Sequence, residues 1–377
     1  MRVTTMSKVI SFFVLGSWFF ASAGAAQTGA ALTKAKQDAE AKGYIFETSH
    51  DDIVNKAKKE GKLVVFASQD DTVVNAVVKA FRKKYPFIEV NAQEISGTDT
   101  YLRMIKEMQI GRPTDWDVNY VAFDYFTNYL PYQKKFDMLG MAQHGVIKMQ
   151  PAMIDPDVRN IVALEANIQS VAYNKKLMPE NKLPKTWEDF LKPEFKGKKF
   201  SVNVRPLALP ALVPLWGLER VLTFARNLKA QDPIWVRGST RTLTYMVTGD
   251  VPLHFGMNHK SLERHKRKKR DPQDVLASKI IEPIPVRLTE AEGISASAAH
   301  PYAALLWLEF QASQEGQKIL DDADLAGSHL SPGTFHEEAT RGKQLSVMDW
   351  KHYPKMTSYQ KAIIEAYGFP VAQKFKK

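Results

Sequence analysis

Apolar runs alternate with amphipathic stretches from residue 50 onward. Residues 63–67 form a continuous apolar run, which predicts a strand buried on both faces. The next segment places Val73, Val77 and Phe81 on one side of a helix, and residues 88–92 again have the pattern of a strand. A strand, a helix and a second strand in this order predict a β-α-β unit with a right-handed crossover.

The alternation continues and divides the chain into two blocks. An exposed lead-in over 27–48 precedes the first block. The expected elements are a helix over 51–59 capped by Ser49, a helix over 101–108, a strand over 116–123, an extended stretch over 161–173, a helix from Thr186, a strand over 199–204, a helix over 238–247, a strand over 251–256, an extended stretch over 280–286 and a helix from Pro301. Two such blocks predict an α/β fold with two lobes and a cleft between them.

Three polar segments follow predicted strands and begin predicted helices. They are residues 68–71, 98–100 and 124–125. Ligands of open α/β sheets lie beyond the carboxyl ends of the strands, and helix N-termini favour anions. We therefore expect a small polar or anionic solute at this edge.

Composition and charge narrow the class of protein. The 377 residues are 44% hydrophobic and include no cysteine, which excludes disulfide scaffolds and thiolate chemistry. The net charge of +11 is concentrated in one run, residues 260–270, which holds seven Lys or Arg against Glu263. The run contains no aromatic residue for stacking on bases, so nucleic-acid binding is not expected. An exposed helix end is favoured, and docking to an acidic partner or lipid surface stays open.

The N-terminus has the pattern of a secretory leader. Arg2 and Lys8 precede an apolar stretch over 9–20, and small residues follow at 21–25. Roughly 12 apolar residues are too few to span a bilayer. We expect a signal peptide over 1–26 that is cleaved to release a periplasmic protein.

Motifs typical of enzymes are missing from the sequence. It contains no G-x-S-x-G, H-E-x-x-H, P-loop or G-x-G-x-x-G pattern. We expect a binding protein without catalytic residues and without a resident cofactor.

Several segments together resemble a known family, the solute-binding proteins of bacterial ABC importers in the ferric-binding-like branch of the type 2 periplasmic-binding fold. The segments that carry the resemblance are EGKLVVFAS at 60–68, FRKKYPFIEV at 81–90, YNKKL at 173–177, LPKTWEDF at 183–190, GDVPL at 249–253 and AHPYAA at 299–304. The resemblance covers roughly residues 50–325.

The resemblance implies a division into lobes and a mechanism. Lobe 1 is expected over 50–165 and 283–335, lobe 2 over 166–282, and C-terminal helices over 336–377 that pack on lobe 2. The extended segments 161–173 and 281–286 would form the hinge. A monomer would close on its solute and dock on a membrane permease; a receptor for a membrane sensor is the alternative.

The resemblance also raises ferric iron as an alternative cargo. Ferric-binding members carry adjacent tyrosines where residues 256–260 read Gly-Met-Asn-His-Lys. An iron site here would need other ligands, for which the candidates are Tyr125, Tyr173, Tyr245 and His259.

The leading hypothesis is an organic anion, such as a carboxylate, phosphonate or sugar phosphate. Guanidinium groups hold such anions through paired hydrogen bonds, and amides and hydroxyls supply neutral donors. The candidate ligand-binding residues are Ser68, Gln69, Thr98, Asp124, Tyr125, Arg205, Arg237, Arg241, Asn258 and His259.

Overall fold

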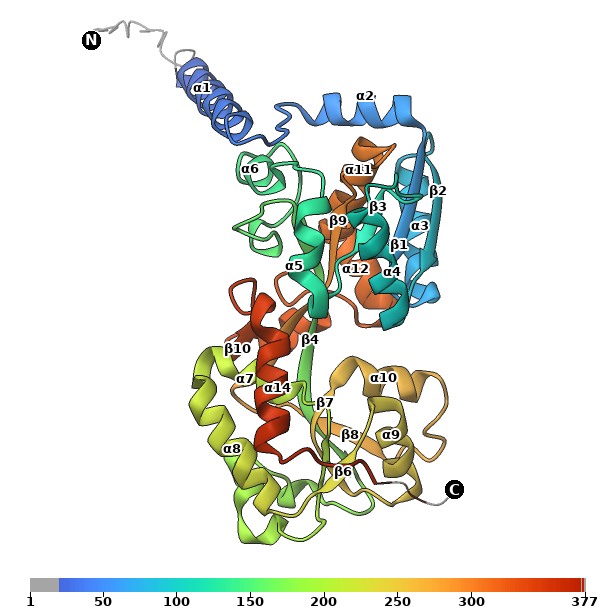
Figure 1. The fold of residues 1–377 in the computed structure, drawn as a ribbon, viewed down its shortest axis with the longest axis vertical. Coiled ribbons are helices and arrows are strands. Elements are labelled where there is room, and N and C mark those ends of the chain that lie inside the picture. The colour runs from blue at the N-terminus through green and yellow to red at the C-terminus, as the bar shows by residue number, and fades with distance from the viewer. Residues whose placement is uncertain (1–19, 374, 376–377) are drawn as a thin grey trace, which may run out of the picture.

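The computed structural model describes residues 20–373 and 375 and has two α/β lobes, one above the other in Figure 1. The strands are β1 Lys62–Ala67, β2 Glu89–Glu94, β3 Val118–Tyr120, β4 Ile161–Asn174, β5 Ser201–Asn203, β6 Ile234–Val236, β7 Leu253–Asn258, β8 Leu276–Lys279, β9 Ile284–Ile294 and β10 Leu345–Met348. The helices are α1 Phe20–Glu40, α2 His50–Glu60, α3 Asp71–Lys84, α4 Thr98–Gln109, α5 Phe126–Tyr129, α6 Met138–Gln143, α7 Ala208–Trp216, α8 Leu218–Ala230, α9 Ser239–Thr248, α10 His259–Arg267, α11 Pro301–Ala312, α12 Gln314–Asp324, α13 Phe335–Thr340 and α14 Met356–Ala366.

Strand β4 is shared by the two lobes. The hydrogen-bonded order is β2-β1-β3-β9-β4-β7-β5-β6. The first half of β4, residues 161–168, pairs antiparallel with β9 in lobe 1. Its second half pairs with β7 and β8 in lobe 2. The strands of the two lobes are therefore joined through β4.

Each lobe has its own apolar core. In lobe 1, the apolar faces of α3 and α11 pack around β1, with Phe81 in contact with the rings of Trp307 and Phe310. In lobe 2, Trp187 and Phe255 lie in a cluster that the C-terminal helix α14 covers together with α7 and α8. No helix among the described residues is long and apolar enough to cross a membrane.

Two helices begin where the sequence predicts, and in both a side chain caps a backbone N–H group. Ser49 accepts a hydrogen bond from the N–H of Asp52 at the start of α2, and Asn258 accepts one from Ser261 at the start of α10. The β-α-β unit is present as β1, α3 and β2, with the two strands parallel.

Four expectations from the sequence are corrected. The lead-in over 27–48 is largely helix α1, because its alanine-rich sequence has high helix propensity. The helix expected from Thr186 is only a 3-10 turn over Glu188–Leu191, because Pro193 cannot supply the next N–H. Strand β3 covers three residues only, and within the 280–286 segment only residues 284–286 are in a strand, which is β9 and continues to Ile294.

Candidate functional site

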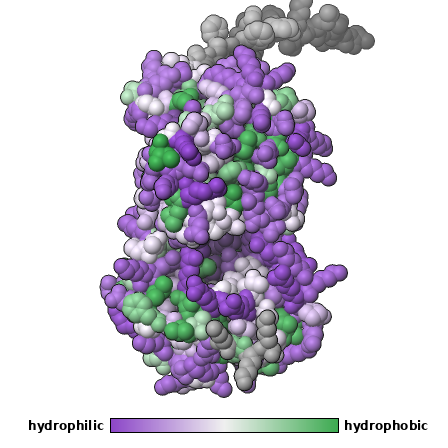
Figure 2. Space-filling view, turned by 45° about the vertical axis from the view of Figure 1, so that its right-hand side comes forward, coloured by the Kyte–Doolittle hydropathy of each residue, from purple (hydrophilic) through white to green (hydrophobic). Residues whose placement is uncertain are grey.

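The cleft between the lobes contains two cavities. Figure 2 shows a hollow between the lobes with hydrophilic residues around it. One cavity, of about 280 Å³, lies between the loop after β1 and helix α10. The other, of about 390 Å³, lies between Phe123 and the start of α9. A small pocket shares Asn203, Arg205 and Ser239 with the second cavity and Asn258 with the first. The cavities thus belong to one cleft.

The first cavity is lined by carboxylates that are held by specific partners. The hydroxyl and backbone N–H of Ser68 donate to Glu290 at 2.5 and 2.8 Å. Burial, reinforced by the charge of Glu165, raises the pKa of Glu290 to about 8. Glu290 also has a left-handed backbone (φ 49°), a conformation that costs energy for a residue with a side chain.

Glu165 connects this cavity to lobe 2. It accepts a hydrogen bond from Gln69 at 3.1 Å and pairs with the ammonium group of Lys260 at 2.8 Å. The side chains of Glu165 and Lys260 are only 4% and 11% exposed. This ion pair is therefore desolvated and joins β4 to helix α10 across the cleft.

The second cavity is rich in arginine. Arg205, Arg237 and Arg287 line it, and none of its lining residues is acidic. The guanidinium of Arg287 lies 4.9 Å from the ring centroid of Phe123, and burial lowers the pKa of Arg287. Arg205 pairs with Asp124 of lobe 1 at 2.8 Å. This cavity therefore has surplus positive charge.

Arg287 has no protein counter-ion among the described residues. It is 6% exposed, and no ion pair or side-chain hydrogen bond joins its guanidinium to another described residue. Charged side chains this deeply buried are almost always paired. The arrangement is suited to an anion that would enter the cleft.

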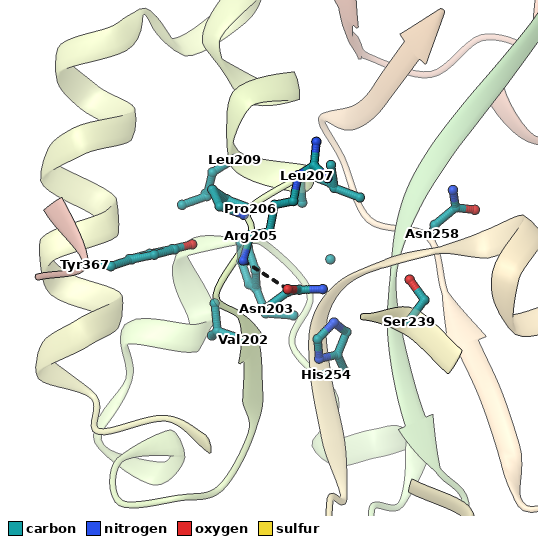
Figure 3. A pocket seen from close by; sticks show the side chains of 13 residues that line it. Val202, Asn203, Arg205, Pro206, Leu207, Leu209, Ser239, His254, Asn258 and Tyr367 are labelled. Atoms are coloured by element: carbon teal, nitrogen blue, oxygen red, sulfur yellow. Dashed lines mark hydrogen bonds between the residues drawn. The ribbon is translucent and has the colours of Figure 1, made fainter. Parts of the chain in front are cut away.

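The start of α9 lies at the same cavity. Gly238 precedes the helix with φ 82°, a conformation that favours glycine, and no side chain caps the first turn. The first N–H groups of a helix have no partners within the helix. Figure 3 shows Asn203, Ser239 and His254 around the adjoining pocket, with the N–H of Arg205 bonded to Asn203 at 3.0 Å.

The basic run of 260–270 contacts lobe 1 through α10 and the residue that follows it. Arg264 pairs with Asp324 at the end of α12, and Lys268 lies 3.5 Å from Asp70. Lys266 instead pairs with Asp274 within lobe 2. The run is thus only in part the exposed helix end that the sequence favoured, because several of its charges join the two lobes.

The cleft brings together about half of the candidates from the sequence. Ser68, Gln69 and Asn258 line the first cavity, and Arg205 and Arg237 line the second. Asp124 reaches the cleft through its ion pair with Arg205 and lies in a 3-10 turn that ends at Tyr125.

The other candidates have different surroundings. Thr98 is exposed in the first turn of α4, and Arg241 is exposed on α9 outside the cavities. The ring of His259 stacks on the ring of Phe335, with the two ring centroids 4.6 Å apart, and burial lowers the pKa of His259 to about 4.

The tyrosines considered for iron do not share a site. Tyr173 is in the core of lobe 2, and Tyr245 packs on Phe375. Tyr125 belongs to a cluster in lobe 1. Within residues 20–373, no group of three or more His, Asp or Glu side chains is placed to hold a metal ion.

Sequence reasoning missed Glu165, Lys260, Arg287 and Glu290 as cleft residues. A signal was present for two of them. Glu165 interrupts the apolar run 161–166, and Arg287 interrupts 284–288. A charged residue within a strand that is buried on both faces is rare unless it has a partner or a ligand.

The sequence of this chain matches the model of a known protein family. The model described as "Bacterial extracellular solute-binding protein" matches residues 127–354, more than half of the chain. The chain therefore belongs to this family, whose members bind solutes for transport and are not enzymes. No curated protein matches this sequence.

Solved structures show the same two-lobe fold. A Trichodesmium protein solved with iron and citrate ligands is 18% identical, with a TM-score of 0.64, and the match covers 81% of this chain and 99% of that one. Ferric iron-binding protein A from Mannheimia haemolytica, in an open conformation, is 16% identical, with a TM-score of 0.65 and coverage of 81% and 98%. An ABC transporter substrate-binding protein from Bradyrhizobium japonicum is 15% identical, with a TM-score of 0.62 and coverage of 81% and 99%. The expected type 2 periplasmic-binding fold is confirmed.

Proposed function

We propose that this chain captures a small organic anion in the periplasm and delivers it to an ABC permease in the inner membrane. The observation that carries the proposal is Arg287, a buried guanidinium that forms no ion pair with any residue the structure describes and that lines the cleft together with Arg205 and Arg237. An anion would supply the missing charge, and paired hydrogen bonds to guanidinium groups would orient it.

The proposal includes the route and the motion of the protein. The leader over 1–26, of which residues 1–19 lie outside the described residues, would be removed on export. The lobes would rotate about β4 and the segment 281–286, with boundaries near residues 165 and 282, and close on the solute as a monomer. The closed form would then dock on the permease; docking on a membrane sensor is the alternative.

The experiment is native mass spectrometry of protein released from the periplasm without chelator. We expect an excess mass that matches an organic anion. Arg237→Ala should lose this excess. Arg241→Ala removes the same charge four residues further along, in the first turns of α9 and outside the cavity, and should keep the excess. Equal retention in both variants would refute the proposed site.

Ferric iron is the second candidate cargo, supported by the similarity in fold to the Trichodesmium protein solved with iron and citrate and to ferric iron-binding protein A of Mannheimia haemolytica. An excess mass that matches iron, abolished by chelator, would replace the anion proposal. The ligands would then be sought among Tyr125, Tyr173, Tyr245 and His259 by single substitutions to Phe or Gln.

A further inference from the structure

The charge balance of the arginine cavity narrows the kind of anion it would take. Three guanidinium groups line the cavity, and Asp124, the carboxylate whose charge acts on Arg287, is already paired with Arg205. Arg237 and Arg287 remain without a counter-ion among the described residues. The surplus is two positive charges, which matches a dianion better than a monocarboxylate.

The number of donors leads to the same conclusion. Besides the guanidinium groups, the cavity meets the uncapped first turn of the ten-residue helix α9 and the hydroxyl of Ser239. One arginine can satisfy both oxygens of a carboxylate in a bidentate pair. A phosphoryl or phosphonyl group presents three terminal oxygens and about two charges at neutral pH, so it can accept from several donors at once.

We infer that the anionic group taken by this cleft is the dianion of a phosphate monoester or of an unesterified phosphonate, bound where Arg237, Arg287 and the first turn of α9 meet. The inference rests on the proposed function and specifies the class of solute for the same site. The buried guanidinium of Arg287 is the observation that points to a ligand independently of the helix start. Arg205 keeps Asp124 as its partner and contributes long-range charge.

The first test is the phosphorus content of the native complex. Elemental mass spectrometry of protein released from the periplasm and washed in phosphate-free buffer should find one phosphorus per protein chain. Arg237→Ala should lose it, and Arg241→Ala should retain it. A bound organic anion without phosphorus would overturn this inference and leave the proposed function in place. Bound iron without an organic anion would overturn both.

A second test decides the question if the protein is isolated empty. Methyl phosphate and acetate are compared at equal concentration in a thermal-shift assay. We expect methyl phosphate to raise Tm at pH 7.5, with an effect that weakens toward pH 5 because the dianion gains a proton near pH 6. Arg287→Lys and Arg237→Ala should each reduce the shift. An equal shift by acetate, a shift independent of pH or no shift with methyl phosphate would refute the inference.

Discussion

The Lys260–Glu165 ion pair should control closure of the two lobes. It joins α10 of lobe 2 to β4 at 2.8 Å, with side chains that are 11% and 4% exposed. Lys260→Met removes the cation and leaves the Glu165 carboxylate in a cleft that also contains Glu290. Opening the lobes would expose Glu165 to water, so the substitution destabilises the closed form relative to the open form.

The size of the effect follows from the burial of the pair. Removing one partner of a buried ion pair costs about 3–5 kcal/mol. Because Lys260 is partly exposed, we take the lower limit, about 3 kcal/mol, which lowers the closed-to-open ratio about 150-fold. Glu165→Gln in the same chain removes the unpaired charge and should recover much of the loss.

The assay is single-molecule energy transfer between the lobes. The chain has no cysteine, so Lys106→Cys on α4 and Arg226→Cys on α8 place one dye on an exposed position of each lobe. The control is Lys266→Met, because Lys266 pairs with Asp274 inside lobe 2. If Lys260→Met closes as often as the control, the ion pair does not stabilise the closed form and the reasoning is wrong.

Three further predictions concern stability, each measured as the free energy of unfolding in urea. Burial raises the pKa of Glu290 to about 8, so the contribution of Glu290 to the free energy of unfolding is full below about pH 4.5 and is lost as pH rises to 8. Glu290→Gln should flatten this decline, and an unchanged slope in the variant would contradict the prediction. Burial lowers the pKa of His254 to about 3, so stability should fall by about 1.4 kcal/mol per pH unit below pH 6.5, and less steeply in His254→Gln. Gly256→Ala would bring its Cβ within 2.4 Å of the Cβ of Ala208 at φ 73°, so a loss above about 2 kcal/mol is expected; a loss near zero would refute the packing described.

The features that the sequence alone determined are local. The run at 63–67, the caps at Ser49 and Asn258 and the apolar face of α3 predict their elements because each signal lies within a few residues of the backbone it organises. The order of these elements then gives the α/β class and places Ser68 at a strand end facing the cleft.

The composition of the cleft was decided by the tertiary structure. Ser68 and Glu290 are hydrogen-bonded across 222 positions of the chain, and no short pattern encodes that pairing. Arg237 and Arg241 looked equivalent in the sequence, but only Arg237 lines the cavity, because it precedes the first turn of α9 and Arg241 lies on the exposed side of the helix. The position of Arg287 in the cleft depends on the pairing of β9 with β4, and its guanidinium lies beside Phe123. Local propensity thus determined the elements, and long-range strand pairing determined which charges meet in the cleft.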